Sequence, residues 1–294
     1  MSASAVGIGA AHAAGGARTG PSPRRQAKPR AGRIGLRTIA LGYLTLLVLA
    51  PVAMIFYRTF EHGLHPVWVA ISTPDAVHAL WLTVLIALVA VPLNTVFGIG
   101  MALALERRRI RGRGAINVLL DLPFAISPVV VGLALLLVYG QQGWFGDWLT
   151  SHGIRVIFSI PGMVLATIFV SLPFVVREVV PVLRELGTDA EQAAQTLGAS
   201  SWQTFWRITL PAIRWAVVYG VVLTTARALG EFGAVSVVSG RLVGRTLSAP
   251  LYVQNEFENF DLTGAYAAAV VLALFALATL GAMHLLTRRM RRMG

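Results

Sequence analysis

Residues 79–105 read ALWLTVLIALVAVPLNTVFGIGMALAL, and this stretch decides the fold class. It contains no charged residue and is longer than the roughly 20 apolar residues that a helix needs to cross the hydrocarbon core of a bilayer. Five further stretches are similarly long and almost free of charge: 38–57, 114–139, 156–176, 215–240 and 263–287. The sequence therefore predicts an all-α integral membrane protein with six transmembrane helices.

The composition agrees with a membrane protein and excludes several classes of function. Hydrophobic residues make up 56% of the 294 residues and charged residues only 13%, against about a quarter charged in soluble domains. The chain has no Cys, which excludes disulfides, a thiol nucleophile and Cys-ligated metals. A nucleic-acid partner is not expected despite the net charge of +12, because such binding needs its basic residues on a solvated surface.

The distribution of Lys and Arg predicts the topology. Twenty of the 25 basic residues lie in the tail to Arg37, in the connections 106–114 and 177–214, and after residue 287. The alternate connections contain only four, and Arg227 lies inside the fifth stretch. Because cytoplasmic loops are enriched in Lys and Arg, this alternation predicts six spans with both termini in the cytoplasm. Five spans after a cleaved signal is the alternative, but no small-residue cleavage motif precedes Arg58.

The two ends of the chain differ in composition from the membrane region. Residues 1–33 are rich in Gly, Ala, Pro and Arg, and such a segment cannot bury enough apolar surface to order itself. We expect a disordered basic tail there, a membrane domain over 34–287, and a short basic tail over 288–294. The arginines of the first tail would lie near anionic lipid.

The connection 177–214 has helix signals of its own. Thr188 and Glu191 fit a capping box, and the segment 200–203 repeats that pattern. Gly198 can end the first helix in the left-handed conformation, and Pro211 is expected to limit the second. The sequence predicts two short helices that meet at a glycine elbow.

Each of these helices presents a distinctive face. The first carries small or apolar side chains at Ala193, Ala194 and Leu197. The second carries an apolar stripe at spacings of three and four, formed by Trp202, Phe205, Trp206 and Thr209. Such a stripe needs a cover. The sequence leaves open whether the chain's own helix ends cover it or whether a partner docks on it.

Arg227 and Glu231 form a charged pair, four residues apart, within an otherwise uncharged stretch. Each alone costs about 2.5 to 3.5 kcal/mol on membrane-insertion scales, so they are expected to pair with each other or with Asp121. A structural ion pair and a position beside a water-filled pathway both fit. Small and hydroxyl residues surround the pair and could line such a pathway: Gly230, Gly233, Ser236 and Ser239.

The connection also resembles the EAA loop of ABC-importer permeases. Gln192-Ala193-Ala194, three residues, Gly198, nine residues, then Ile208, Thr209, Leu210 and Pro211 reproduce that pattern, except that Gln192 stands where the family usually has Glu. The resemblance implies the transmembrane domain of a type I ABC importer over 34–287. It also implies that a separate ATPase subunit contacts the following residues: Glu191, Gln192, Ala193, Ala194, Leu197, Gly198, Trp202, Phe205, Ile208, Leu210 and Pro211.

No phosphate-binding GxxxxGK[ST] motif occurs in the chain. ATP and Mg are therefore expected on the partner ATPase, and no cofactor is expected here. We expect a transporter subunit rather than an enzyme, because the six histidines are scattered and an enzyme needs clustered catalytic groups. A secondary transporter that uses the Arg227 and Glu231 pair as a proton switch leaves the elbow unexplained.

Three segments make the resemblance narrower. The runs 92–98 (PLNTVFG), 121–128 (DLPFAISP) and 226–240 (ARALGEFGAVSVVSG) are similar to the W-type permease of sulfate/thiosulfate importers. This implies a bacterial inner-membrane protein that pairs with a T-type permease, two ATP-binding subunits and an extracytoplasmic sulfate/thiosulfate-binding protein. Molybdate and tungstate permeases share part of the last run and remain the alternative.

Overall fold

The computed structural model describes residues 30–108 and 110–293, and this part of the chain is helical without any strand. Contacts divide the chain into two units, residues 1–51 and 52–294. The first contains α1 (Arg30–Leu44) and the π turn η1 (Thr45–Leu49). The expected disordered tail falls largely on residues 1–29, which lie outside the described part.

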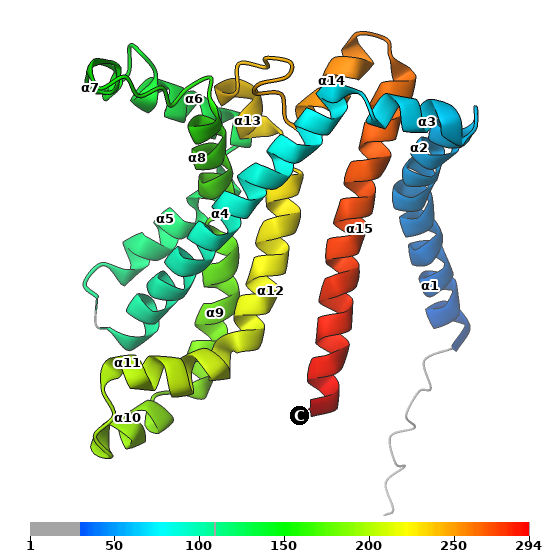
Figure 1. Cartoon of the computed structure of the whole chain (residues 1–294). Coiled ribbons are helices and arrows are strands. Elements are labelled where there is room, and N and C mark those ends of the chain that lie inside the picture. Colours follow the sequence, from blue (N-terminus) through cyan, green and yellow to red (C-terminus); the bar gives the residue numbers. More distant parts are fainter. Residues whose placement is uncertain (1–29, 109, 294) are drawn as a thin grey trace, which may run out of the picture. The chain divides into compact units, whose positions relative to one another are not determined.

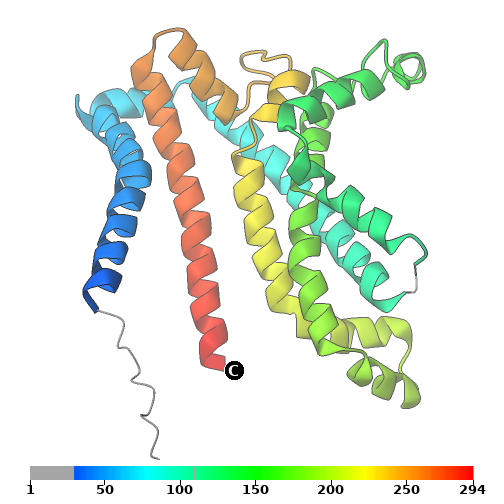
Figure 2. The ribbon, with the colours of Figure 1, turned by 180° about the vertical axis from the view of Figure 1, so that it is seen from behind.

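The second unit contains the remaining helices (Figures 1 and 2). They are α2 (Ala50–Phe60, from residue 52), α3 (Leu64–Ile71), α4 (Pro74–Arg107), α5 (Arg113–Ala125), α6 (Pro128–Tyr139), α7 (Gly146–Ser151), α8 (Ile160–Ser171) and α9 (Pro173–Leu186). After these come α10 (Asp189–Thr196), α11 (Ser201–Thr204), the π turn η2 (Phe205–Thr209), α12 (Leu210–Leu229), α13 (Gly233–Val238), α14 (Ala249–Glu258) and α15 (Leu262–Met293).

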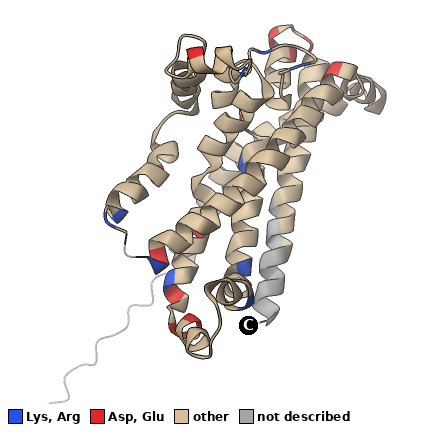
Figure 3. Cartoon of the chain, turned by 60° about the vertical axis from the view of Figure 1, so that its left-hand side comes forward, with Lys and Arg blue, Asp and Glu red and all other residues tan. Residues whose placement is uncertain are grey.

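Five helical segments in the described residues are long and apolar enough to cross a membrane: Arg37–Phe60, Pro74–Arg107, Ile160–Leu186, Ser201–Leu229 and Leu262–Thr279. The helices α5 and α6 make a sixth crossing if they count as one bent span. Lys, Arg, Asp and Glu gather towards the two ends of the helices, and long uncharged stretches lie between them (Figure 3). This is the arrangement expected of a multi-pass membrane protein.

The third apolar stretch, 114–139, is not one straight helix. The axes of α5 and α6 differ by 112° at the break between Ala125 and Pro128. Ser127 has the extended conformation (ψ 135°), which a residue before proline favours because the proline ring disfavours the helical conformation there. Pro128 then starts α6.

The predicted fifth span, 215–240, is also wrong in its bounds. Helix α12 ends at Leu229, and residues after it lead into the separate helix α13. Gly233 begins α13 against α6, and a Cβ atom at Gly233 would lie 2.7 Å from the Cβ of Pro128. The continuous helix instead begins earlier, at Ser201.

Helix α9 packs against both α4 and α12, and these two helices also contact each other. Val175 of α9 is fully buried, and it faces Gly98 of α4 and Gly220 of α12. A Cβ atom at Gly98 would lie 2.6 Å from the Val175 Cβ, and one at Gly220 would lie 2.9 Å from the Val175 Cα. Both glycines are therefore needed for the close approach of these three helices.

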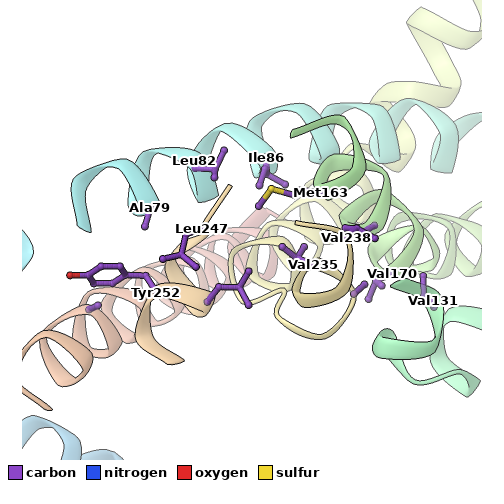
Figure 4. Packing of buried hydrophobic residues seen from close by; sticks show 14 of the residues in the cluster. Ala79, Leu82, Ile86, Val131, Met163, Val170, Val235, Val238, Leu247 and Tyr252 are labelled. Carbon is purple, nitrogen blue, oxygen red and sulfur yellow. The ribbon is translucent and has the colours of Figure 1, made fainter. Parts of the chain in front are cut away.

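Another cluster of buried residues joins α4, α8, α13 and α14 (Figure 4). Leu82 of α4, Met163 of α8 and Val235 of α13 meet there with Leu251 of α14. Two hydrogen bonds of one side chain connect α4 with α8: the side-chain amide of Asn94 donates to the Ile168 carbonyl at 3.1 Å and to the Ser171 hydroxyl at 2.8 Å. Helix α4 extends from this cluster towards the end of the helices where α10 and α11 lie (Figure 1).

Candidate functional site: the elbow and the two charged clusters

Residues 189–209, here called the elbow, lie beyond the ends of α4 and α9 (Figure 1). Helix α10 ends where Gly198 adopts a left-handed conformation, with φ +88°. The amide of Gly198 donates to the Gln195 carbonyl and that of Ala199 to the Ala194 carbonyl, both at 3.0 Å. This is the hydrogen-bond pattern of a Schellman motif. The predicted elbow at Gly198 is confirmed.

One of the two predicted capping boxes is present. The Ser200 hydroxyl accepts from the Gln203 amide, and the Gln203 side chain accepts from the Ser200 amide. The box predicted at Thr188 and Glu191 is wrong. Thr188 makes no capping bond, and its hydroxyl instead accepts from the Gln192 side chain at 2.7 Å. Glu191 is drawn away because it pairs with an arginine on another helix.

Pro211 does not limit the second helix, which continues from Ser201 to Leu229. Proline inside an α-helix removes a donor and clashes with the carbonyl one turn earlier. The preceding turn, η2, is a π turn, in which the Leu210 amide donates to the Phe205 carbonyl. This wider turn lies directly before Pro211, so α12 begins afresh with the proline in its first turn.

The elbow exposes most of the residues predicted to contact an ATPase. Leu197 is 89% exposed and Trp202 69% exposed, although both are large and apolar. Trp206 packs edge-to-face on Trp202 and Phe205, and only Thr209 of the predicted stripe is buried. The other predicted contact residues are exposed at Gln192, Ala193 and Gly198 and half-buried at Glu191, Ala194, Ile208 and Leu210, while Pro211 is exposed. The chain's own helices therefore leave the stripe largely uncovered.

A cluster of charged side chains connects the elbow with neighbouring helix ends. The Glu191 carboxylate lies 2.8 Å from the Arg107 Nε at the end of α4. Its other oxygen accepts a 2.9 Å hydrogen bond from the Thr209 hydroxyl. Beside it, the Glu106 carboxylate lies 2.8 Å from Arg113 and 2.9 Å from Arg184.

Sequence reasoning missed this cluster, because its members come from four separate elements: α4, α5, α9 and α10. The available signal was the excess of arginines in the connections 106–114 and 177–214, which we interpreted only as topology. The structure brings these two connections together.

Arg227 and Glu231 pair with each other, with 2.6 Å between guanidinium and carboxylate. They do not lie on one continuous helix, because α12 ends at Leu229. The second Glu231 oxygen accepts from the Ala234 amide at 2.8 Å in the first turn of α13. The side chain of Glu231 is 2% exposed and that of Arg227 is 29% exposed. Glu231 thus joins two successive helices across the break between them.

The other predicted pathway residues serve the local backbone. The Ser236 hydroxyl donates to the Gly233 carbonyl, and the Ser239 hydroxyl accepts from the Arg241 amide. Gly230 is the last residue before Glu231, and a Cβ atom there would lie 3.7 Å from the Ala226 carbonyl oxygen, an ordinary contact distance. Asp121 does not approach Arg227: it pairs with Arg177 of α9, and both side chains are about half exposed.

Comparison with known proteins places these features in a family. Residues 94–292 match the family described as "Binding-protein-dependent transport system inner membrane component". The chain is 53% identical to the "Sulfate transport system permease protein CysW" of Synechocystis sp. over 86% of this chain and 92% of that protein. It is 52% identical to the Escherichia coli (strain K12) protein of the same name, over 82% and 84% of the two chains.

A more distant relative and a solved structure extend the match. The E. coli (strain K12) "Sulfate transport system permease protein CysT" is 38% identical over 87% of this chain and 94% of that one. The fold matches a chain of a bacterial ABC transporter involved in alginate import, with a TM-score of 0.73, 18% identity, and coverage of 88% and 96%. This chain is therefore a multi-pass member of the binding-protein-dependent transport system inner membrane component family.

Proposed function

We propose that this chain is the membrane-spanning permease subunit of an ATP-driven importer and couples to a separate ATPase subunit through the elbow. One observation carries this proposal: the elbow exposes Leu197, Trp202 and Trp206 beyond the helix ends. Apolar side chains that the chain itself leaves uncovered fit a partner surface. The ATPase would hold ATP and Mg, and the elbow end of the helices would face the cytoplasm.

We propose sulfate or thiosulfate as the imported anion. Relatives between 49% and 53% identical over more than four fifths of this chain are named sulfate transport permeases. A second permease of the T type, two ATP-binding subunits and an extracytoplasmic sulfate/thiosulfate-binding protein would complete the importer. The less similar T-type relatives, at 38% to 40% identity, support a heterodimer of two different permeases.

Uptake of labelled sulfate tests this assignment. A sulfur-starved strain without this subunit should take up little sulfate, and the full chain should restore uptake. Excess unlabelled thiosulfate should compete, and molybdate should not. Restored uptake that molybdate abolishes while thiosulfate does not would instead favour a molybdate or tungstate permease.

We further propose that Arg227, rather than Glu231, is the member of the charged pair that faces the pathway. Its guanidinium is partly exposed, whereas the Glu231 carboxylate is enclosed and has both oxygens engaged. Arg227→Lys keeps a positive charge beside Glu231 but loses the planar donor array that recognises oxyanions. Sulfate uptake should fall while the melting temperature and the membrane level of the chain stay unchanged. Unchanged uptake would leave Arg227 with a structural role only.

A further inference from the structure

Helix α10 is held to the rest of the chain by very little apolar packing. It packs mainly against α11 and η2, and none of its residues is buried. Gln192 and Ala193 of this helix are exposed, as is Leu197 directly after its end. A helix with so few buried contacts has low local stability, so its position depends on its chain connections and on specific polar bonds. The bonds made by Glu191 are therefore decisive for the position of α10.

Glu191 connects α10 to two separate helices at once. One oxygen pairs with Arg107 at the end of α4, and the other accepts from Thr209, directly before α12. Arg107 also donates to the Leu183 carbonyl of α9 at 3.1 Å. The ends of the three helices that pack around Val175 thus meet at the Arg107 and Glu191 pair, with α9 linked to it through Arg107.

The environment of the pair makes the loss of one partner more costly than it would be at the surface. The side chains of Arg107 and Glu191 are only 16% and 17% exposed. An exposed pair contributes little because water and salt screen it, whereas removal of one partner of a shielded pair leaves the other without compensation. The loss of Glu191 would release α10 from α4 without removing any of its exposed side chains.

We propose that Glu191 is a positioning residue that transmits movement of the elbow to α4 and α12. A force applied to the exposed face of α10 passes through the Glu191 carboxylate to Arg107 and Thr209, and from there to helices that carry the membrane-spanning core. This proposal rests on the proposed function of the elbow as the ATPase contact. It assigns Glu191 to the inner side of the elbow, where it fixes α10 rather than binds the ATPase.

The first experiment measures the position of α10 and needs no substrate. Because the chain has no Cys, cysteines at Gln195 and Arg108, both exposed, take a pair of spin labels specifically in the purified full-length chain. Glu191→Gln should broaden the distance distribution between the labels. The exchange variant Arg107→Glu with Glu191→Arg should narrow it again. Glu106→Gln is the matched control, because Glu106 pairs with α5 and α9 but not with α10.

The second experiment measures coupling in the assembled transporter. Glu191→Gln should retain the ATPase subunits on co-purification, while the anions transported per ATP fall about fivefold. The exchange variant should regain at least half of the loss. An unchanged label distance in Glu191→Gln would overturn the proposal, as would an unchanged transport ratio or a loss of the ATPase subunits. A wild-type complex without sulfate transport would overturn the proposed substrate, and the label distances would still decide the role of Glu191.

Discussion

Glu191 and Glu231 have the same chemistry but join different kinds of segments. Each carboxylate has one oxygen paired with an arginine and the other bound to a neutral donor. The partners of Glu231 lie three and four residues away in the chain, in the helices that adjoin it. The partners of Glu191 lie on the distant helix α4 and in the turn before α12.

The Glu231 contact fixes the local backbone, whereas the Glu191 contact links helices that we propose move relative to one another. The Glu231 bonds hold the break between α12 and α13 and exclude water from the carboxylate. The Glu191 bonds join elements that are far apart in the chain. The side chains of Glu191 and Arg107 remain partly accessible to solvent. The variants below test this distinction, from the largest expected effect to the smallest.

Glu231→Gln should produce the largest loss of stability. The amide can still accept from the Ala234 N–H, but Arg227, whose side chain is 29% exposed, is left without its counter-charge. The loss of one partner of a buried pair costs up to about 3–5 kcal/mol of unfolding free energy. The melting temperature of the purified chain should fall clearly. Glu61→Gln is the control, because its pair with Arg58 lies on the surface and contributes at most about 1 kcal/mol. Equal melting temperatures for the two variants would contradict the comparison.

Gly198→Val should disturb the elbow but not the membrane-spanning helices. No atom would lie within 4 Å of the new Cβ, so the cost comes only from the left-handed backbone, which costs a side chain roughly 1–2 kcal/mol. The amount of ATPase that co-purifies should fall, with normal insertion of the chain. Gly198→Asn should retain most of it, because Asn tolerates this conformation. Full retention by the valine variant would refute the role of the glycine.

Thr209→Val should have the smallest effect of the three. The variant keeps the size of a buried side chain and removes one hydrogen bond to Glu191, which contributes about 0.5–1.5 kcal/mol. The Arg107 pair remains, so the label distance between α10 and α4 should widen less than in Glu191→Gln. A change as large as that of Glu191→Gln would mean that Thr209, and not Arg107, holds α10 in place.

The sequence predicted the class of fold and the elbow well, because both depend on local signals. Long apolar stretches identify the spans, and Gly198 and the box at Ser200 and Gln203 identify the elbow. The same local reasoning placed Glu191 in a capping box. That prediction was wrong because Arg107, far away in the chain, provides a stronger partner for the Glu191 carboxylate than the backbone amide of the N-cap residue Thr188.

The helix bounds near prolines and glycines were harder to predict. Pro211 indicates a helix end on its own, but the π turn before it allows the helix to continue. The stretch 215–240 is apolar throughout, so its composition conceals the end of α12 at Leu229. The start of α13 depends on its contacts with α6, which no local sequence pattern encodes.

The π turn before α12 also sets the direction in which the aromatic residues of the elbow point. Successive residues of an α-helix are separated by about 100° around its axis, and a π turn accommodates one residue more than an α turn. If η2 were an ordinary α turn with the same number of residues, Trp202, which precedes it, would therefore point about 100° away from its present direction around the helix axis. The direction in which this indole ring points thus depends on the width of the single turn η2 as well as on the residue that carries it.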